Sequence, residues 1–273
     1  MKSSRPTHEE DANERYHNRI AHRYDDIYRG ARWDYWYELS WTPTKAQLPS
    51  DLRAPVLDVG CGTGKYGLRA AKSGYHVTLS DLSQGMVDVA RQKAEALDLL
   101  DRTAFLKADV MDLSALPREH FALAIAQGDV LSFAGHPGRA VKELRKVLRP
   151  GGVLVASLDQ TLAALDHYCE KNDLDSLERL VRNGEMEWLA NDISERFPVH
   201  TFTPEKLRDL FETAGFEVLD LFGKTVLPFK KLEPLFAEEE QAERIMTLEK
   251  RLCRLPSAMG RASHLQIAVK KKE

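Results

Sequence analysis

The sequence lacks the features that mark secreted and membrane proteins. Its three cysteines, Cys61, Cys169 and Cys253, form neither a C-x-x-C pair nor an even set for disulfides, which indicates a reducing compartment. The residues that follow Met1 are polar and then acidic, so no signal peptide is expected. The apolar runs are far shorter than the roughly 20 residues that a membrane helix needs. We therefore expect a cytoplasmic protein with no membrane partner.

The sequence also lacks a large excess of charge of one sign. Among its 273 residues, 39 Lys and Arg stand against 42 Asp and Glu, which gives a formal net charge of −3. Proteins that bind DNA usually carry a basic face, so no DNA partner is expected. Neither internal repeats nor low-complexity segments interrupt the chain, and the hydrophobic fraction of 43% is sufficient for a sizeable core. The oligomeric state is left open.

What is present is a regular alternation of short apolar runs with helical patterns. This alternation is typical of βαβ units and predicts a doubly wound α/β fold with a mostly parallel sheet. Ligands of such folds bind at the carboxyl ends of the strands. The predicted strands are 56–59, 76–80, 103–107, 121–126, 153–158, 216–222 and 265–269, the last of them at or near an edge.

The chain divides into three predicted parts. Residues 1–12 form a disordered tail, 13–50 a helical segment rich in aromatic residues, and 51–273 the α/β domain. Because the sheet is complete without the aromatic segment, we expect residues 13–41 to act as a lid. Helical insertions at about 160–200 and 225–260 are expected to shape the substrate side of that lid. Residues 161–190 and 233–253 have helical patterns.

One motif points to a nucleotide-like ligand. The stretch Asp58–Gly64 (DVGCGTG) leaves a predicted strand and enters a helix, as a nucleotide-binding glycine loop does. Glycines in such a loop permit positive φ and remove the Cβ atoms that would hold a ligand away from the backbone. Asp81 ends the second strand, where a carboxylate can accept both hydroxyls of a ribose. Asp109 follows the third strand, where it can meet an adenine amino group.

The residue at position 65 separates two candidate ligands. The dinucleotide pattern G-x-G-x-x-G/A would place Gly or Ala there, and this chain has Lys65. S-adenosylmethionine has no phosphate and instead needs a carboxylate near its ammonium group. Asp58 is placed to supply one, directly or through water. The sequence therefore favours S-adenosylmethionine, and a dehydrogenase is disfavoured.

This motif resembles the first motif of class I S-adenosylmethionine-dependent methyltransferases of the small-molecule type. Further segments resemble the same family, namely Ser80–Ser83 with Met86, Ala108–Val110, Leu148–Gly152 and Asn18–Asp25. The resemblance covers about residues 15 to 160. It implies a seven-stranded sheet whose last strand is antiparallel, with S-adenosylmethionine as cofactor and S-adenosylhomocysteine as product.

The resemblance also implies a role for individual residues. Asp81 would hold the ribose, Leu82 and Met86 would sandwich the adenine, Asp109 would meet its amino group, and Gln127 would lie beside the sulfonium. The full set of expected cofactor-binding residues is Tyr24, Asp58, Gly60, Gly62, Gly64, Asp81, Leu82, Met86, Asp109, Val110 and Gln127.

The acceptor of the methyl group is not identified by the sequence. A hydroxyl acceptor needs a base, for which His136 and Asp129 are candidates, with His264 as a second histidine. Some of the leader aromatics are candidates for the acceptor pocket, although ordinary helix packing explains them equally well. These are Tyr28, Trp33, Trp36 and Trp41. No histidine–carboxylate group has the spacing of a metal site, so no metal is expected.

Several acceptor classes are weighed against one another. DNA amino-methylating members of the family carry an Asp/Asn-Pro-Pro-aromatic loop, whereas residues 127–130 here read Gln-Gly-Asp-Val. No cysteine follows a proline, which disfavours cytosine-carbon methylation. A small molecule, methylated at oxygen, nitrogen or sulfur, is therefore the favoured acceptor. A protein or tRNA acceptor is the alternative, and a non-catalytic S-adenosylmethionine-binding module is a third hypothesis.

Overall fold

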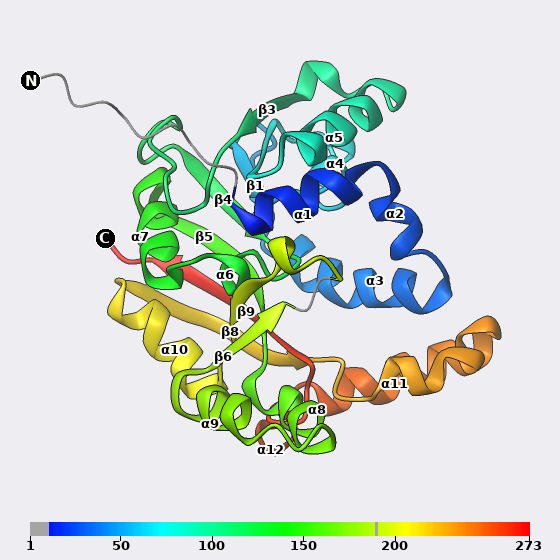
Figure 1. The fold of residues 1–273 in the computed structure, drawn as a ribbon. Helices are drawn as coiled ribbons and strands as arrows, with labels where there is room; N and C mark the ends of the chain where they lie inside the picture. The colour runs from blue at the N-terminus through cyan, green and yellow to red at the C-terminus, as the bar shows by residue number, and fades with distance from the viewer. Residues whose placement is uncertain (1–10, 189–190) are drawn as a thin grey trace, which may run out of the picture.

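The computed structural model describes residues 11–188 and 191–273, and one seven-stranded sheet forms its centre (Figure 1). The strand order is β3-β2-β1-β4-β5-β9-β8. Neighbouring strands are parallel except at β9, which is antiparallel to both β5 and β8. This confirms the predicted α/β sheet. The strands are β1 Val56–Val59, β2 Val77–Asp81, β3 Thr103–Lys107, β4 Phe121–Ala126, β5 Leu148–Asp159, β8 Phe216–Lys224 and β9 His264–Lys271.

Two layers of helices cover the sheet because its central strands are apolar on both faces. All six residues of β4 are buried, and alternate side chains enter different cores. Helices α7 (Pro137–Val147) and α10 (Pro204–Thr213) pack on one face. Helices α4 (Gly67–Lys72) and α5 (Gln84–Ala96) pack on the other.

The predicted helix starts are confirmed by their capping bonds. Ser83 Oγ accepts a hydrogen bond from the Met86 backbone N–H at 3.1 Å, at the start of α5. Thr203 Oγ1 accepts from the Lys206 N–H at 3.3 Å, with Pro204 as the first residue of α10.

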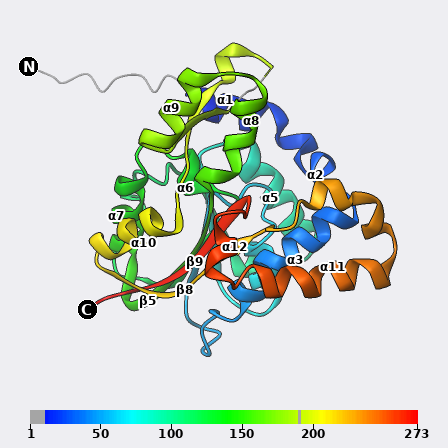
Figure 2. The same ribbon diagram turned by 90° about the horizontal axis from the view of Figure 1, so that it is seen from below.

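The leader segment forms three helices that lie along the carboxyl edge of the sheet and beside it. They are α1 Ala12–Ile20, α2 Tyr24–Ile27 and α3 Ala31–Lys45. Asp11 caps α1 by accepting from the Glu14 N–H, so the last two residues of the expected tail belong to this helix start, while residues 1–10 lie outside the described chain. Helix α3 lies beside α11 (Glu239–Leu252) and shares an apolar cluster with it (Figure 2).

The first insertion is only partly helical, which corrects one prediction. Helices α8 (Leu165–Glu170) and α9 (Leu174–Asn183) form as expected. Gly184 then adopts φ 73° and ends α9, so Glu185–Trp188 leaves the helix as strand β6. It pairs in an antiparallel hairpin with β7 (Phe197–His200). The remaining short helices are α6 Val130–Phe133 and α12 Pro256–Met259, with 3₁₀ turns at Ala21–Arg23, Leu100–Arg102, Thr161–Ala164, Ile193–Glu195 and Phe229–Ala237.

One smaller difference concerns strand β5. It begins at Leu148, before the predicted Pro150–Gly152 turn, and the turn remains as an irregularity in the pairing of β5 with β4. Strand β9 lies near an edge of the sheet, as predicted, because it inserts between β5 and the edge strand β8. Within the described ranges, no helix is long and apolar enough to cross a membrane.

We expect Thr203→Ala to lower the free energy of unfolding by about 1 kcal/mol, because it leaves a backbone N–H of α10 without its cap. Urea unfolding should show a lower midpoint with an unchanged m-value. Thr247→Ala is the control, since Thr247 is an exposed residue of α11 whose hydroxyl donates to the Glu243 carbonyl and caps nothing. Equal losses in the two variants would contradict the capping role.

Candidate functional site

A cavity of about 820 Å³ opens at the carboxyl ends of the central strands. Its floor is formed by the loops that follow β1, β2, β4 and β5, and its other walls by the leader helices and the β6–β7 hairpin. This is the edge at which parallel α/β sheets bind their ligands, and a volume in this range suits a small ligand or cofactor.

The glycines of the loop after β1 serve different purposes. All three have positive φ: Gly60 at 62°, Gly62 at 51° and Gly64 at 85°. A Cβ atom on Gly62 would meet no protein atom within 4 Å, and Gly62 lines the cavity, so this is the position that leaves room for a ligand. A Cβ on Gly60 would strike Val130, and one on Gly64 would strike Leu68. Gly64 does not line the cavity, which corrects its expected contact with the cofactor.

Asp58 has a different position from the one expected. It is 1% exposed and is not among the residues that line the cavity. Its Oδ2 accepts the backbone N–H of Gly67, at the start of α4, at 2.7 Å. Burial raises the pKa of the Asp58 carboxyl to about 7, although the bond from Gly67 opposes this. Asp58 therefore joins β1 to α4 without itself lining the cavity.

Asp81 points from the end of β2 into the cavity, as predicted. Its two carboxylate oxygens accept the backbone N–H groups of Gly62 at 2.8 Å and Ser83 at 2.9 Å. Burial raises the pKa of this carboxyl, and the nearby His17 opposes the shift. His17 itself is a cavity residue of α1 whose pKa burial lowers. The two backbone bonds hold the Asp81 carboxylate in a fixed orientation while each oxygen keeps a lone pair free.

The side chains expected around an adenine gather at the same end of the cavity. Leu82, Met86, Asp109 and Val110 all line it. Met86 is 1% exposed and packs against Ile20 and Ala21 of the leader. The Asp109 carboxylate accepts the Met111 N–H at 2.8 Å, which fixes its direction at the end of β3.

The loop after β4 contributes polar groups near the middle of the cavity. Gln127 and Asp129 both line it. Gln127 Nε2 donates to Thr44 of α3 at 3.2 Å, and its Oε1 is buried without a partner in the described chain. Asp129 adopts φ 64°. Ser157 of β5 donates to its Oδ1 at 2.9 Å and so fixes this carboxylate.

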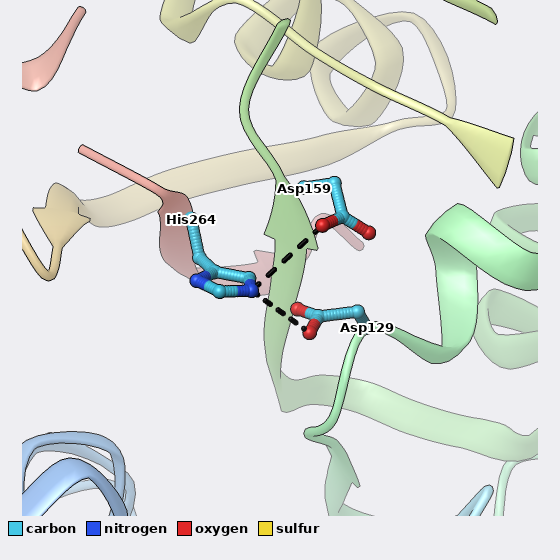
Figure 3. Close-up of side chains that lie close together, drawn as sticks. All are labelled: Asp129, Asp159 and His264. Atoms are coloured by element: carbon cyan, nitrogen blue, oxygen red, sulfur yellow. Dashed lines mark ion pairs between the residues drawn. The ribbon is translucent and has the colours of Figure 1, made fainter. Parts of the chain in front are cut away.

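A second carboxylate and a histidine approach Asp129 from two other segments. Asp159 ends β5 and His264 begins β9 (Figure 3). His264 Nε2 lies 3.4 Å from Asp129 Oδ2 and 3.7 Å from Asp159 Oδ1. The fully buried ammonium of Lys224 lies 3.9 Å from the centre of the Trp36 ring. We call Asp129, Asp159, Lys224 and His264 the polar cluster.

Burial determines the ionisation of the polar cluster. It raises the pKa of Asp159 well above its usual range, and the charge of Asp129 adds to this. It lowers the pKa of Lys224 to about 8, against the opposing attraction of both carboxylates. It also lowers the pKa of His264. Each of these shifts disfavours the charged form of its group.

Aromatic side chains form much of the remaining wall. Tyr24, Tyr28, Trp33 and Trp36 of the leader line the cavity as expected. Trp41 does not, because it faces the sheet and is buried in the core beside α4. Its expected place in an acceptor pocket is therefore corrected. The wall also contains Tyr16, Tyr37, Phe133, Trp188, Phe197 and Phe229.

His136 is the other corrected prediction. It is exposed at the start of α7, outside the cavity, and lines a separate surface hollow with Arg139 and Lys142. Ala134 and Gly135, which follow α6, still line the cavity, and the chain leaves it at His136, where α7 begins.

Several residues that line the cavity or belong to the polar cluster were not predicted from the sequence, and only one of them lies at a position that the sequence pattern could have identified. Asp159 directly follows a predicted strand, in the same way as Asp81, and this placement could have found it. His17, Trp188 and Phe197 enter the cavity from the leader and from the hairpin that was predicted as helix. No local pattern distinguishes Lys224 from the chain's other lysines.

The position of the cavity at the carboxyl ends of the strands agrees with the similarity of the chain to known methyltransferases. A methyltransferase domain model matches residues 56–152. The tRNA 5-carboxymethoxyuridine methyltransferase of Escherichia coli (strain K12) is 26% identical over 82% of this chain and 81% of that protein. A ubiquinone/menaquinone biosynthesis C-methyltransferase of Rhodopseudomonas palustris (strain TIE-1) is 32% identical over 51% of this chain and 56% of that one. An S-adenosylmethionine-dependent methyltransferase structure from Methanosarcina mazei has a TM-score of 0.61 and 21% identity, covering 84% and 97% of the two chains.

The fold and the matched domain define a class I methyltransferase. This domain at residues 56–152, with the fold around it, supports an S-adenosylmethionine-dependent methyltransferase with S-adenosylmethionine as its cofactor.

We expect Asp81→Asn to weaken S-adenosylmethionine binding about thirtyfold, or about 2 kcal/mol, because it removes the charge from hydrogen bonds to the ribose. Isothermal titration calorimetry measures the affinity, and circular dichroism checks the fold. Asp88→Asn, on the exposed side of α5, is the matched control. Unchanged affinity in a folded Asp81→Asn protein would overturn the role of Asp81.

Proposed function

We propose that this enzyme transfers the methyl group of S-adenosylmethionine to a small-molecule acceptor by in-line displacement. The observation that carries this proposal is the shape of the cavity. It extends from Asp81 and Asp109, past Gln127, to Asp159, under a wall of aromatic side chains. Such a cavity can bind an acceptor of limited size together with the cofactor and exclude water from both.

The cofactor position follows from the cavity residues. In our proposal Asp81 binds the ribose, Leu82, Met86 and Val110 contact the adenine, and Asp109 meets its amino group. Tyr24, Gly60, Gly62 and Gln127 would lie along the methionine part. The open space at Gly62 supports this placement, because a Cβ atom there would occupy the volume that the ligand needs.

The acceptor would then lie between the sulfonium and the polar cluster. In-line transfer requires the nucleophile about 3 to 3.5 Å from the methyl carbon and opposite the sulfur. We keep Asp129 as a residue that contacts the acceptor, since Ser157 fixes its carboxylate at that end of the cavity. Tyr28, Trp33 and Trp36 would provide the apolar contacts.

We further propose that the leader and the β6–β7 hairpin close the cavity as a two-part lid. Arg19 of α1 donates two hydrogen bonds to the buried Glu195, at 2.6 and 2.5 Å. The ring of Tyr16 meets that of Trp188 at 5.6 Å between centroids. A bidentate ion pair of this kind is among the stronger polar contacts, and here it joins segments 176 residues apart in sequence.

We expect Arg19→Met to lower hydrogen-exchange protection of α1 and the hairpin about tenfold, which is about 1.4 kcal/mol of local opening free energy. Turnover should fall, while global stability in urea changes little. Arg29→Met is the control, because its pair with Asp26 is exposed within the leader itself. Unchanged protection in Arg19→Met would argue against the two-part lid.

A tRNA acceptor is the alternative. It is supported by the similarity of most of the chain to a tRNA methyltransferase. A tRNA base would have to leave its stack and enter the cavity, and basic side chains would have to contact its phosphates. The formal net charge of −3 gives no support for such contacts.

Labelling distinguishes these acceptors. The enzyme and S-adenosylmethionine with a tritiated methyl group are incubated with the metabolite, tRNA and protein fractions of a bacterial lysate. We expect label in the metabolite fraction, with Asp81→Asn as the control of reduced cofactor binding. Label in tRNA or protein alone would refute a small-molecule acceptor. No label in any fraction, with cofactor binding intact, would also count against the proposal.

A further inference from the structure

The polar cluster contains three potential metal ligands that the sequence keeps far apart. Asp129, Asp159 and His264 follow β4, end β5 and begin β9, and Figure 3 shows their side chains pointing toward one another. Their donor atoms all lie within 4.8 Å of one another. In residues 11–188 and 191–273, they are the one group of three or more His, Cys, Asp or Glu side chains that meets this condition.

The distances between these atoms suit ligands of one ion better than hydrogen-bond partners. His264 Nε2 is 3.4 and 3.7 Å from the two carboxylate oxygens, whereas N–H···O bonds are about 2.7 to 3.2 Å long. Two adjacent ligands of one ion, each about 2.1 Å from it, lie about 3.0 Å apart in octahedral geometry and about 3.4 Å apart in tetrahedral geometry. Small side-chain adjustments would bring all three atoms to such separations.

Among the residues that the structure describes, the two carboxylates of the cluster are not paired with a lysine or arginine side chain, so a bound cation could balance their charge. Within the described chain, neither Asp129 nor Asp159 has a Lys or Arg nitrogen within 4 Å. Lys224 is the basic residue that belongs to the polar cluster, and its side chain is fully buried. Its ammonium lies against the Trp36 ring and has no hydrogen-bond partner in the described chain. An oxygen ligand on a bound ion would supply the lone pair that this ammonium lacks.

We propose that Asp129, Asp159 and His264 bind one divalent transition-metal ion at the acceptor end of the cavity. One imidazole nitrogen with two carboxylates is a donor set that suits Mn²⁺ or Fe²⁺ better than Ca²⁺ or Mg²⁺, which favour oxygen ligands alone. Three protein ligands leave coordination positions open, and all three residues line the cavity.

The role of the ion rests on the proposed function, although its binding does not. An acceptor hydroxyl on the ion would lose its proton to solvent more readily. Its oxygen would then form the new bond to the methyl carbon, and the carbon–sulfur bond would break with its electron pair remaining on sulfur. The products are the methyl ether or ester and S-adenosylhomocysteine.

Mn²⁺ binding to the full-length, EDTA-treated protein tests the site without an acceptor. Loss of the free Mn²⁺ signal in electron paramagnetic resonance should show one ion per chain, with a Kd below about 100 μM. Asp159→Asn and His264→Gln should each weaken binding at least about tenfold. Asp88→Asn, on the exposed side of α5 and outside the cavity, should leave the affinity unchanged. Lys224→Met should tighten binding at least about threefold, because it removes a competing cation.

A second measurement does not depend on affinity. Pulsed electron paramagnetic resonance should detect a ¹⁴N coupling from a coordinated imidazole, retained in His17→Gln and lost in His264→Gln. No saturable binding up to about 1 mM Mn²⁺, no nitrogen coupling, or full affinity in folded Asp159→Asn and His264→Gln would overturn the site. S-adenosylhomocysteine binding by the same samples checks their fold. Methyl transfer by an enzyme that binds no metal would leave the proposed function intact.

Discussion

The hydrogen bond between the Gly67 N–H and the buried Asp58 carboxylate joins the central strand to the first helix of the α/β domain. It requires a glycine, since a Cβ atom on Gly67 would lie 2.7 Å from Asp58 Oδ2. Because both ends of the glycine loop are fixed in this way, Gly62 is held where its N–H reaches Asp81. The cofactor end of the cavity therefore depends on a carboxylate that does not itself face the cavity.

The cavity changes in chemical character along its length. At the cofactor end, backbone N–H groups orient the carboxylates of Asp81 and Asp109, so each has a fixed direction and a satisfied bond. At the acceptor end, the polar cluster contains buried titratable groups, and two of its nitrogens, Lys224 Nζ and His264 Nδ1, have no hydrogen-bond partner in the described chain. Buried charges that lack partners cost stability, and they are typical of places where a ligand completes the compensation. This contrast supports separate roles for the two ends.

The lid depends on contacts between segments that are distant in sequence. Arg19 and Glu195 belong to the leader and to the first insertion, and neither segment has a hydrophobic core of its own. Helix α3 is held more firmly, since Trp41 lies in the main core and Leu39 packs with α11. The leader thus combines a half at α3, anchored in the core, with a half at α1, where Ile20 packs against Met86 and Arg19 pairs with Glu195.

The sequence by itself determined the sheet, the glycine loop and Asp81, because these depend on local periodicity, on glycine conformation and on residues placed directly after a strand. It failed at 185–188, where Gly184 ends a helix and the following residues gain their hydrogen bonds from β7 instead. It also assigned His136 and Trp41 by proximity in sequence, although the chain leaves the cavity at His136, where α7 begins, and the face of α3 directs Trp41 into the core. Only the tertiary structure brought Asp159, Lys224 and His264 to Asp129, because strand order and crossovers set which loops meet, and no local pattern encodes contacts between residues on separate strands and loops.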